Sequence, residues 1–564
     1  MRRIKTLALI ATETVDLKRR HQLPLLPLLL ALLLAAAAPV RAAGALVPTV
    51  VDAIRPGATG STPIYAATLG AWVYFSAQDG IHGSELWRTN GETTELVEDI
   101  RVGGTGSTAQ DLVAIGDWIF FRADEGSDGQ ELWRTNGTIT EQVKDIRVGA
   151  TGSAPWGFTQ FGGWVYFSAA ADGVQGRELW RTNGIETELV EDINPGAGNS
   201  SPEEFQPLGS WLYFEATDGV YGRELWRTNG TITALVKDIN GGPESSYIYE
   251  MTPLGDWLYF AADDTVDGCE IWRTNGLTTA LVANTSPEAV SCPNGLTAFN
   301  GWIYYSFTDG FSGGELWRTN GTTTELVEDI NLTGSSAPGN SSGFVALGDW
   351  LYFDATDGTT GRELWRTNGA RTELFADLNP VGSSHPYDIS SYGGWLYFRI
   401  TTSAGRDQLW RTNGSVTEQI SFADSTVDFG YVMGKTNGRL ILSVTSPATG
   451  DEFAWLTVME RAVASVKPTI AGQAKVGKTL TAAKGTWSGT PAPSFRYQWY
   501  ACTSALSAPR STLISSCSAI AGATKSTFKV TRGQKGRYIA VLVTGTSSGT
   551  LPTKWLSKTT TKVP

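Results

Sequence analysis

The chain has 564 residues, too many for one ordinary hydrophobic core, so we expect one large domain and an appended smaller one. Its net charge of −12 is unevenly distributed: residues 1–43 carry +5, residues 466–564 carry +14, and the segment between them carries −31. This acidic body lacks the basic face that nucleic-acid binding requires, which excludes that function for it. We interpret the acidic charge as that of a highly soluble extracellular surface. The alternative is cation binding by the body, with attachment of the basic tail to an anionic cell-envelope polymer.

Residues 1–43 have the pattern of a signal peptide. An apolar run at residues 23–38 follows three basic residues at 18–20, and small residues at 40–42 offer a cleavage site. The run is shorter than the roughly 20 residues of a membrane span. We therefore expect a secreted or cell-surface protein whose mature chain has no transmembrane segment.

Residues 44–460 are organised around the repeated phrase Glu-Leu-Trp-Arg-Thr-Asn-Gly. Identical copies occupy residues 85–91, 131–137, 178–184, 224–230, 315–321 and 363–369, and variants occupy residues 270–276 and 408–414. Successive copies are 45 to 48 residues apart. A period of this length with strand-like content is typical of a β-propeller.

Each repeat divides into four short strands, as the fourth repeat illustrates. Its predicted strands are residues 204–208, 211–217, 223–227 and 234–239. Apolar side chains occupy both faces of the second strand, which predicts that both faces are covered, as in a blade packed between two others. Asp218-Gly219 and Asn229-Gly230 supply the positive φ angles of tight hairpins.

The two ends of the repeat region predict how the ring closes. Residues 47–55 match a fourth strand and its exit, whereas residues 438–442 and 452–455 match the second and third strands of an incomplete ninth unit. The N-terminal strand is expected to complete that unit, which gives nine blades. Eight blades with the remnants packed outside is the alternative.

The repeat units resemble the bacterial ELWxxDGT repeat, over about residues 47–460. The resemblance implies a large secreted protein with a propeller fold, and it implies no particular activity. This chain has Asn where the family name has Asp, at Asn136, Asn229 and Asn320.

Residues 461–564 resemble the immunoglobulin-like modules of secreted actinobacterial proteins. The resemblance rests on residues 477–480, Trp487, residues 497–499, residues 520–524 and residues 536–538. It implies a β-sandwich with Trp499 in the core and Tyr538 as a candidate corner tyrosine. Ala540 stands where such domains place their second cysteine. The predicted fold is therefore all-β, a propeller followed by an immunoglobulin-like sandwich.

Four cysteines in a chain expected to be secreted predict two disulfides. Proximity favours Cys269 with Cys292, and Cys502 with Cys517, the latter closing a local loop. Two free buried thiols are the alternative for the first pair.

The repeated charged residues are expected to be structural. Rotationally related copies of Glu224 and Arg227 do not bring unlike groups to one point, as catalysis requires, so we expect cross-strand or inter-blade Glu–Arg pairs. His82 and His385 lie in different repeats, which argues against a zinc site or a His-based triad. The Asp-Gly hairpin aspartates are candidate calcium ligands, although a purely turn-forming role is the alternative. They are Asp79, Asp172, Asp218, Asp309 and Asp357.

Three aromatic residues depart from the repeat pattern and are candidate ligand contacts: Trp156 in a crossing loop, and Tyr221 and Phe311 in Asp-Gly hairpins. We expect a binding protein for an extracellular glycan or protein. The alternatives are a purely structural surface protein and a polysaccharide-active enzyme. The enzyme would need non-repeated carboxylates to converge at one mouth of the channel; the candidates are Glu125, Glu203, Glu204, Glu244, Glu250 and Asp388.

Overall fold

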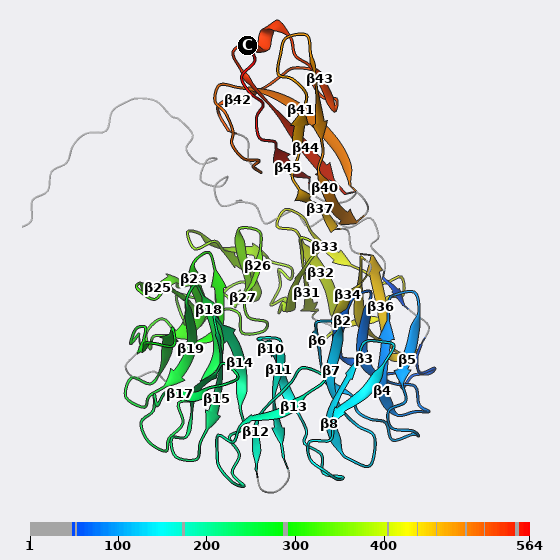
Figure 1. The fold of residues 1–564 in the computed structure, drawn as a ribbon, viewed down its shortest axis with the longest axis vertical. Coiled ribbons are helices and arrows are strands. Elements are labelled where there is room, and N and C mark those ends of the chain that lie inside the picture. Colours follow the sequence, from blue (N-terminus) through cyan, green and yellow to red (C-terminus); the bar gives the residue numbers. More distant parts are fainter. Residues whose placement is uncertain are drawn as a thin grey trace, which may run out of the picture.

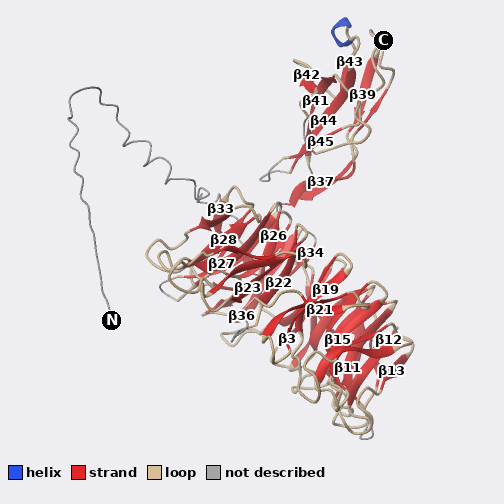
Figure 2. Ribbon diagram, turned by 90° about the vertical axis from the view of Figure 1, so that its left-hand side faces the viewer, coloured by secondary structure: helices blue, strands red, loops and turns tan. Residues whose placement is uncertain are grey.

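The computed structural model describes residues 48–50, 53–171, 175–285, 292–402, 405–436, 438–457, 460–490, 493–511, 514–547 and 552–564. Strands dominate these residues, and their one helical element is the 3-10 helix η1 (Arg532–Gln534). A β-propeller-like ring of sheets is followed by a smaller β-sandwich that projects from it (Figures 1 and 2). Within the described residues, no helix is long and apolar enough to cross a membrane.

Eight sheets of the ring each consist of four consecutive antiparallel strands. The first four sheets are formed by β2 (Ile64–Leu69), β3 (Trp72–Gln78), β4 (Ser84–Thr89) and β5 (Thr94–Glu98); β6 (Gln110–Ile115), β7 (Trp118–Asp124), β8 (Gln130–Thr135) and β9 (Thr140–Lys144); β10 (Trp156–Phe161), β11 (Trp164–Ala170), β12 (Arg177–Thr182) and β13 (Thr187–Glu191); and β14 (Glu203–Leu208), β15 (Trp211–Thr217), β16 (Arg223–Thr228) and β17 (Thr233–Lys237).

The next four sheets follow the same order. They are formed by β18 (Tyr249–Leu254), β19 (Trp257–Asp263), β20 (Cys269–Thr274) and β21 (Thr279–Leu281); β22 (Asn294–Phe299), β23 (Trp302–Thr308), β24 (Gly314–Thr319) and β25 (Thr324–Glu328); β26 (Val345–Leu347), β27 (Trp350–Thr356), β28 (Arg362–Thr367) and β29 (Thr372–Ala376); and β30 (Tyr387–Tyr392), β31 (Trp395–Thr401), β32 (Asp407–Thr412) and β33 (Thr417–Ile420).

A further four-stranded sheet combines the two ends of the repeat region. It contains β34 (Asp428–Thr436), β35 (Arg439–Ser446) and β36 (Gly450–Thr457), with β1 (Thr49–Val50) at its edge beside β36. In the antiparallel register, Thr49 lies opposite Trp455 and Val50 opposite Ala454. This sheet, which we call the ninth, thus takes its fourth strand from the N-terminal side of the chain.

Neighbouring sheets are joined by apolar packing on both faces of their second strands. In β15, Phe214 packs towards Tyr166 of the third sheet, whereas Tyr213 packs towards Leu258 and Phe260 of the fifth. Comparable clusters lie between the other consecutive sheets, and one between the first sheet and the ninth joins Phe75 to Phe453, among others. Each fully buried side chain of this kind contributes roughly 1.5–3 kcal/mol. The prediction that both faces of the second strand are covered is confirmed.

The connections between strands define the two faces of the ring. The first strands of neighbouring sheets contact one another, for example β2 with β6 and with β34, so they lie innermost. The segments that cross from one sheet to the next meet the hairpins between second and third strands, since a Cβ on Gly83 would lie 2.4 Å from the backbone nitrogen of Gly106. We call the side where these segments meet the crossing face. The Asn-Gly turns lie on the opposite face.

The C-terminal unit is a sandwich of two main sheets. One contains β38 (Thr469–Ala471), β39 (Thr479–Ala483) and β43 (Thr527–Lys529); the other contains β41 (Ser494–Cys502), β42 (Cys517–Ala519), β44 (Tyr538–Thr546) and β45 (Thr553–Leu556); a separate pair contains β37 (Glu460–Val466) and β40 (Thr486–Thr490). Trp499 is fully buried between the main sheets, stacks on Phe528 and donates its indole N–H to the Lys525 carbonyl at 2.8 Å. Trp499 is therefore a central core residue of this unit.

Candidate functional site

The glutamate of the repeated phrase anchors the segment that crosses to the next sheet. Glu131 is fully buried, and its two carboxylate oxygens accept bonds from the backbone N–H groups of Ile146, Arg147 and Ser153 at 2.7–3.1 Å. The Ser153 hydroxyl donates a further bond at 2.5 Å. Burial raises the pKa of Glu131 although these bonds oppose the effect. The expected pairing of this glutamate with arginine is therefore wrong, because its partners are the crossing backbone and a serine.

The arginine of the phrase donates to the next sheet in four places, from Arg88, Arg181, Arg227 and Arg318. Arg318 lies 4.2 Å from the ring centroid of Trp302 and donates to Glu325 of the fourth strand at 2.8 Å. Its guanidinium also donates to the Gly369 carbonyl in the Asn-Gly turn of the following sheet, at 2.9 Å. Cross-strand Glu–Arg pairs thus exist, but they use the glutamate of the fourth strand. The glutamate and arginine of the repeated phrase therefore stabilise the contacts within and between sheets.

The four predicted calcium aspartates that fall within the described residues act as turn residues. The Asp218 carboxylate accepts the N–H groups of Val220 and Tyr221 at 2.8 and 3.0 Å. The same two-bond pattern occurs at Asp79, Asp309 and Asp357. These bonds lower the pKa of Asp309 against the raising effect of its burial.

The fifth aspartate, Asp172, lies outside the described residues. No group of three His, Cys, Asp or Glu residues suited to a metal ion occurs in the described part of the chain. The aspartates belong to hairpins of different sheets, so each calcium site would have to complete its coordination with backbone carbonyls and water. Calcium binding stays a prediction.

Of the three aromatic residues predicted to contact a ligand, two lie on hairpins and one on an inner strand. Phe311 and Tyr221 project from hairpins of the sixth and fourth sheets and are 96% and 41% exposed. Trp156 was predicted in a crossing loop, which is wrong, because it begins β10, the inner strand of the third sheet, where it is half-buried. Only Trp156 lies in a cavity among those described below.

A groove of about 360 Å³ opens along the inner strands of three successive sheets, β6, β10 and β14. Trp156 and Gly157 form its middle, and Asp111 and Glu204 flank them from the neighbouring strands. The remaining lining residues are mostly apolar: Leu112, Val113, Phe158, Thr159 and Phe205. We call this cavity the Trp156 groove.

A β-bulge at the second residue of each inner strand shapes this groove. The strand register shifts there, and φ is positive at Asp111 (55°), Gly157 (76°) and Glu204 (56°). A left-handed conformation costs a non-glycine residue roughly 1–2 kcal/mol, which makes acidic residues at these positions notable. At position 157 a Cβ would lie 3.0 Å from the Phe205 ring, so glycine keeps the groove open beside Trp156.

The two carboxyl groups of the Trp156 groove differ in their surroundings. Asp111 forms an ion pair with Arg122, with an O–N distance of 3.0 Å. Burial, with repulsion from Glu203 and Glu250, raises the pKa of Glu204. The groove therefore offers one ion-paired carboxylate, one carboxyl group with a raised pKa, and an aromatic residue on the strand between them. This arrangement suits a ligand that has an apolar face and hydroxyl groups at its edge.

Four of the six candidate catalytic carboxylates lie on the inner strands of the ring. Glu203 and Glu204 on the inner strand of the fourth sheet lie near Glu250 on that of the fifth, whereas Asp388 is on the inner strand of the eighth. Glu203 pairs with Arg223, and Asp388 pairs with Arg399 at 2.8 Å. Two further candidates, Glu125 and Glu244, lie in a hairpin and a crossing segment instead.

Sequence reasoning missed Asp111, Gly157 and Phe205 as groove residues. A signal was present: the second inner-strand position is occupied across the first eight sheets by Tyr65, Asp111, Gly157, Glu204, Glu250, Gly295, Gly343 and Asp388. Three glycines in this set indicate a left-handed position. The four acidic residues that share it with them would then have stood out.

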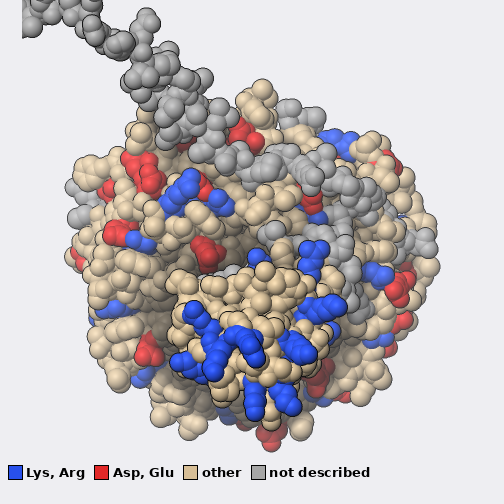
Figure 3. All heavy atoms as spheres, turned by 90° about the horizontal axis from the view of Figure 1, so that it is seen from above, with Lys and Arg blue, Asp and Glu red and all other residues tan. Residues whose placement is uncertain are grey.

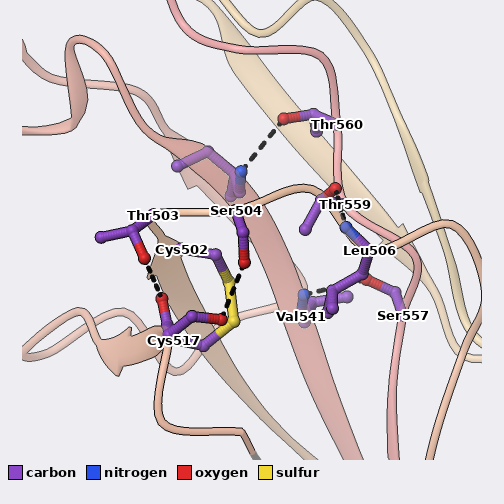
Figure 4. The surroundings of a disulfide bond; sticks show 11 residues. Cys502, Thr503, Ser504, Leu506, Cys517, Val541, Ser557, Thr559 and Thr560 are labelled. Carbon is purple, nitrogen blue, oxygen red and sulfur yellow. Dashed lines mark hydrogen bonds between the residues drawn. A yellow bond between two sulfur atoms is a disulfide. The ribbon is translucent and has the colours of Figure 1, made fainter.

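Both predicted disulfides are confirmed, Cys269–Cys292 in the ring and Cys502–Cys517 in the sandwich. Figure 4 shows the second bond between β41 and β42, where Cys502 and Cys517 lie directly opposite in the register. It closes a local loop within one sheet and does not join the two main sheets. Free thiols are thereby excluded for both pairs.

No protein-family model matches this chain, and no curated protein matches it. Among solved structures, the chain is similar to one described in an analysis of two prolyl endopeptidases, at 13% identity over 64% of this chain and 55% of that one, with a TM-score of 0.35. It is also similar to a puromycin-hydrolyzing peptidase from Mycobacterium tuberculosis, at 11% identity over 66% of this chain and 61% of that one, with a TM-score of 0.33. The chain thus matches less than two thirds of either structure.

Proposed function

We propose that this protein is a secreted or cell-surface glycan-binding protein, with its ligand in the Trp156 groove of a closed nine-bladed propeller. The observation that carries the proposal is the groove itself, where an aromatic ring lies between two carboxyl groups on adjacent inner strands. Two disulfides support export, since such bonds persist in oxidising compartments.

The chemistry of a sugar ring matches this groove. A pyranose presents an apolar C–H face, which can pack on the Trp156 indole, and equatorial hydroxyls that donate to Asp111 and Glu204. Leu112, Val113 and Phe205 exclude water from one side of that contact. The repeated tryptophans that begin the second strands do not offer a free face to a sugar, because an arginine of the same sheet stacks on the ring.

We propose that the C-terminal unit is an immunoglobulin-like module that contacts an anionic envelope polymer. Its sandwich topology and the buried Trp499 support the first point. Fourteen Lys and Arg residues with no Asp or Glu between residues 466 and 564 support the second. Figure 3 shows blue Lys and Arg side chains gathered on one part of the surface, on the unit that projects from the ring.

A polysaccharide-active enzyme is the second candidate, and one observation favours it. Glu204 has a raised pKa, and Asp111 across the same groove is ion-paired with Arg122. Glycoside hydrolysis uses two carboxyl groups of this kind, one protonated and one ionised. In that case Glu204 would be the acid and Asp111 the base or nucleophile. A purely structural role has no comparable supporting feature.

The experiment is a glycan-array screen of the full chain followed by calorimetric titration of each hit. We expect Trp156→Ala to weaken binding at least about tenfold, which corresponds to about 1.4 kcal/mol. The matched control is Ile185→Ala, which removes an apolar side chain that is 92% exposed on an Asn-Gly turn of the opposite face. Tyr221→Ala and Phe311→Ala test whether the site extends onto the hairpins.

Glu204→Gln separates the two candidate functions. A binding protein keeps its ligand and releases no product, whereas an enzyme loses turnover while it still binds. Unchanged affinity in Trp156→Ala for every array hit would refute glycan binding at this groove.

A further inference from the structure

In seven of the nine sheets, the same side-chain hydrogen bond joins the sheet to a crossing segment. A buried glutamate on the third strand, or on β36 of the ninth sheet, accepts a bond from a serine hydroxyl at the end of the crossing segment. The pairs are Glu85–Ser107, Glu131–Ser153, Glu178–Ser200, Glu224–Ser246, Glu315–Ser336, Glu363–Ser384 and Glu452–Ser61. In the fifth sheet the Cys269–Cys292 disulfide closes the same junction.

The eighth sheet lacks both partners of this hydrogen bond. Gln408 replaces the glutamate, and its carboxamide oxygen accepts the Trp410 indole N–H at 3.2 Å. The position of the serine is taken by Asp428, which lies opposite Thr445 in the register and accepts a bond from Arg406 at 2.8 Å. The junction between the eighth and ninth sheets is therefore not tied in the way the seven others are.

A cavity of about 440 Å³ occupies this junction. Leu409, Ile420, Phe422 and Phe429 give it an apolar floor. The carboxamides of Gln408 and Gln419 also line it. The Gln419 backbone pairs with Trp410 in the ladder, but within the described residues its carboxamide makes no hydrogen bond to protein. We call this cavity the Gln419 cavity.

The charged groups at the rim of the Gln419 cavity largely neutralise one another. Arg406 donates to Asp428 at 2.8 Å, and Asp407 accepts from Arg399 at 2.5 Å. Asp424 is exposed and accepts bonds from Thr426. The other hydrogen-bonding side chains of the cavity are thus mostly neutral, the carboxamides of Gln408 and Gln419 and the hydroxyls of Ser421 and Ser425, and they can both donate and accept.

We propose that the Gln419 cavity is a second binding site, which takes a neutral sugar residue. The hydroxyl groups of a sugar also both donate and accept, so they match the Gln419 carboxamide better than a carboxylate or an ammonium group would. The C–H face of a sugar would pack on Phe422 and Phe429, and the volume lies within the range of small-ligand sites. This site is separate from the Trp156 groove and does not depend on the function proposed for it.

The test is saturation-transfer NMR on the full chain carrying Trp156→Ala, so that the groove contributes nothing. The probes are glucose, galactose, mannose, rhamnose and N-acetylglucosamine, with glucuronate and glucosamine as charged comparators. We expect at least one neutral sugar to receive saturation at its ring C–H protons. Adding Gln419→Ala or Val427→Trp, which fills the cavity, should reduce the affinity at least fivefold.

The matched control is Gln142→Ala, because Gln142 holds the equivalent place in the fourth strand of the second sheet, where the Glu131–Ser153 bond is intact. It should leave saturation transfer unchanged. The proposal is overturned if no neutral sugar of the panel receives saturation, if the charged comparators bind more tightly, or if the control reduces transfer as much as Gln419→Ala does. Gln419→Ala decides the matter if Val427→Trp fails to fold.

Discussion

At the scale of single residues, the buried glutamates show that one repeated side chain can differ in its hydrogen-bond partners from sheet to sheet. Both carboxylate oxygens of Glu131 accept hydrogen bonds from the crossing segment. In Glu224, Oε2 accepts from Ile239 and Ser246, whereas Oε1 is buried with no partner within hydrogen-bond distance. Burial raises the pKa of Glu224 to about 7, and Glu363 reaches a similar value.

This difference predicts opposite outcomes for the same substitution at two equivalent positions. Glu131→Gln places an N–H₂ group against backbone donors and should lower the free energy of unfolding by about 1–3 kcal/mol at pH 7. Glu224→Gln can place its N–H₂ group at the unpartnered Oε1 and should change that free energy by less than about 1 kcal/mol. Urea denaturation of both variants measures the contrast, and equal losses would contradict it.

The raised pKa of Glu224 also predicts a pH dependence. The unfolded carboxyl ionises near its ordinary pKa of 4.5, whereas the folded one holds its proton until about pH 7. Between these two pH values the folded state binds more protons than the unfolded state. The contribution of Glu224 to the free energy of unfolding is therefore fully present below pH 4.5 and is lost as the pH rises to about 7. Glu224→Gln should flatten this slope in a series of thermal melts. A slope that the variant leaves unchanged would assign the titration to other groups.

At the scale of elements, the fifth sheet shows a covalent bond at the junction between a sheet and its crossing segment. In the sequence, Ser291 matches the serines of the other sheets, because it precedes the left-handed Gly295 by four residues; it lies outside the described residues. Cys292 follows it, and Cys269 directly precedes the buried Glu270, which accepts the Thr285 N–H at 2.8 Å. The disulfide thus links the third strand covalently to the end of the crossing segment.

Replacing that disulfide tests how much the covalent link contributes. Cys269→Ser with Cys292→Ala should lose the roughly 2–4 kcal/mol typical of a disulfide. Cys269→Ser with Cys292→Ser should lose a similar amount, because position 292 lies one residue beyond the position from which the serines of the other sheets donate. Denaturant unfolding of the two double variants measures both losses. A loss below about 1 kcal/mol would show that the disulfide does not stabilise this junction.

The elements themselves could be predicted closely from the sequence, because strand period and turn chemistry are local. The second strand of the fourth sheet was expected at residues 211–217 and is observed as Trp211–Thr217. The fourth strand was expected to reach residue 239 but ends at Lys237, since the Ile239 N–H turns to the Glu224 carboxylate instead of the sheet.

The Trp156 groove could be predicted only in part, as the single residue Trp156. Its other walls come from inner strands about 45 residues away on either side, and its shape depends on a left-handed bulge. Neither property is visible in the pattern of one repeat. The Gln419 cavity likewise becomes visible only when the junctions of all nine sheets are compared.

At the scale of the whole molecule, charge separates the two units. The segment between residues 44 and 465 carries −31, whereas residues 466–564 carry +14. Like charges on the ring repel an anionic polymer, so any attraction must come from the C-terminal sandwich. Five exposed cations lie close together in sequence around η1: Lys525, Lys529, Arg532, Lys535 and Arg537.

The full chain should therefore bind an acidic polysaccharide such as polygalacturonate and ignore neutral dextran. Several surface cations act together in such binding, so the affinity should fall steeply as sodium chloride rises from about 50 to 500 mM, because the Debye length shrinks. The triple variant Lys529→Glu, Arg532→Glu, Lys535→Glu should weaken binding more than about tenfold at low salt. Arg371→Glu, which alters a propeller cation that is 61% exposed, is the control and should leave binding unchanged. Binding that is insensitive to salt and to the triple variant would place the polymer contact elsewhere, and binding of dextran would show that charge does not select the partner.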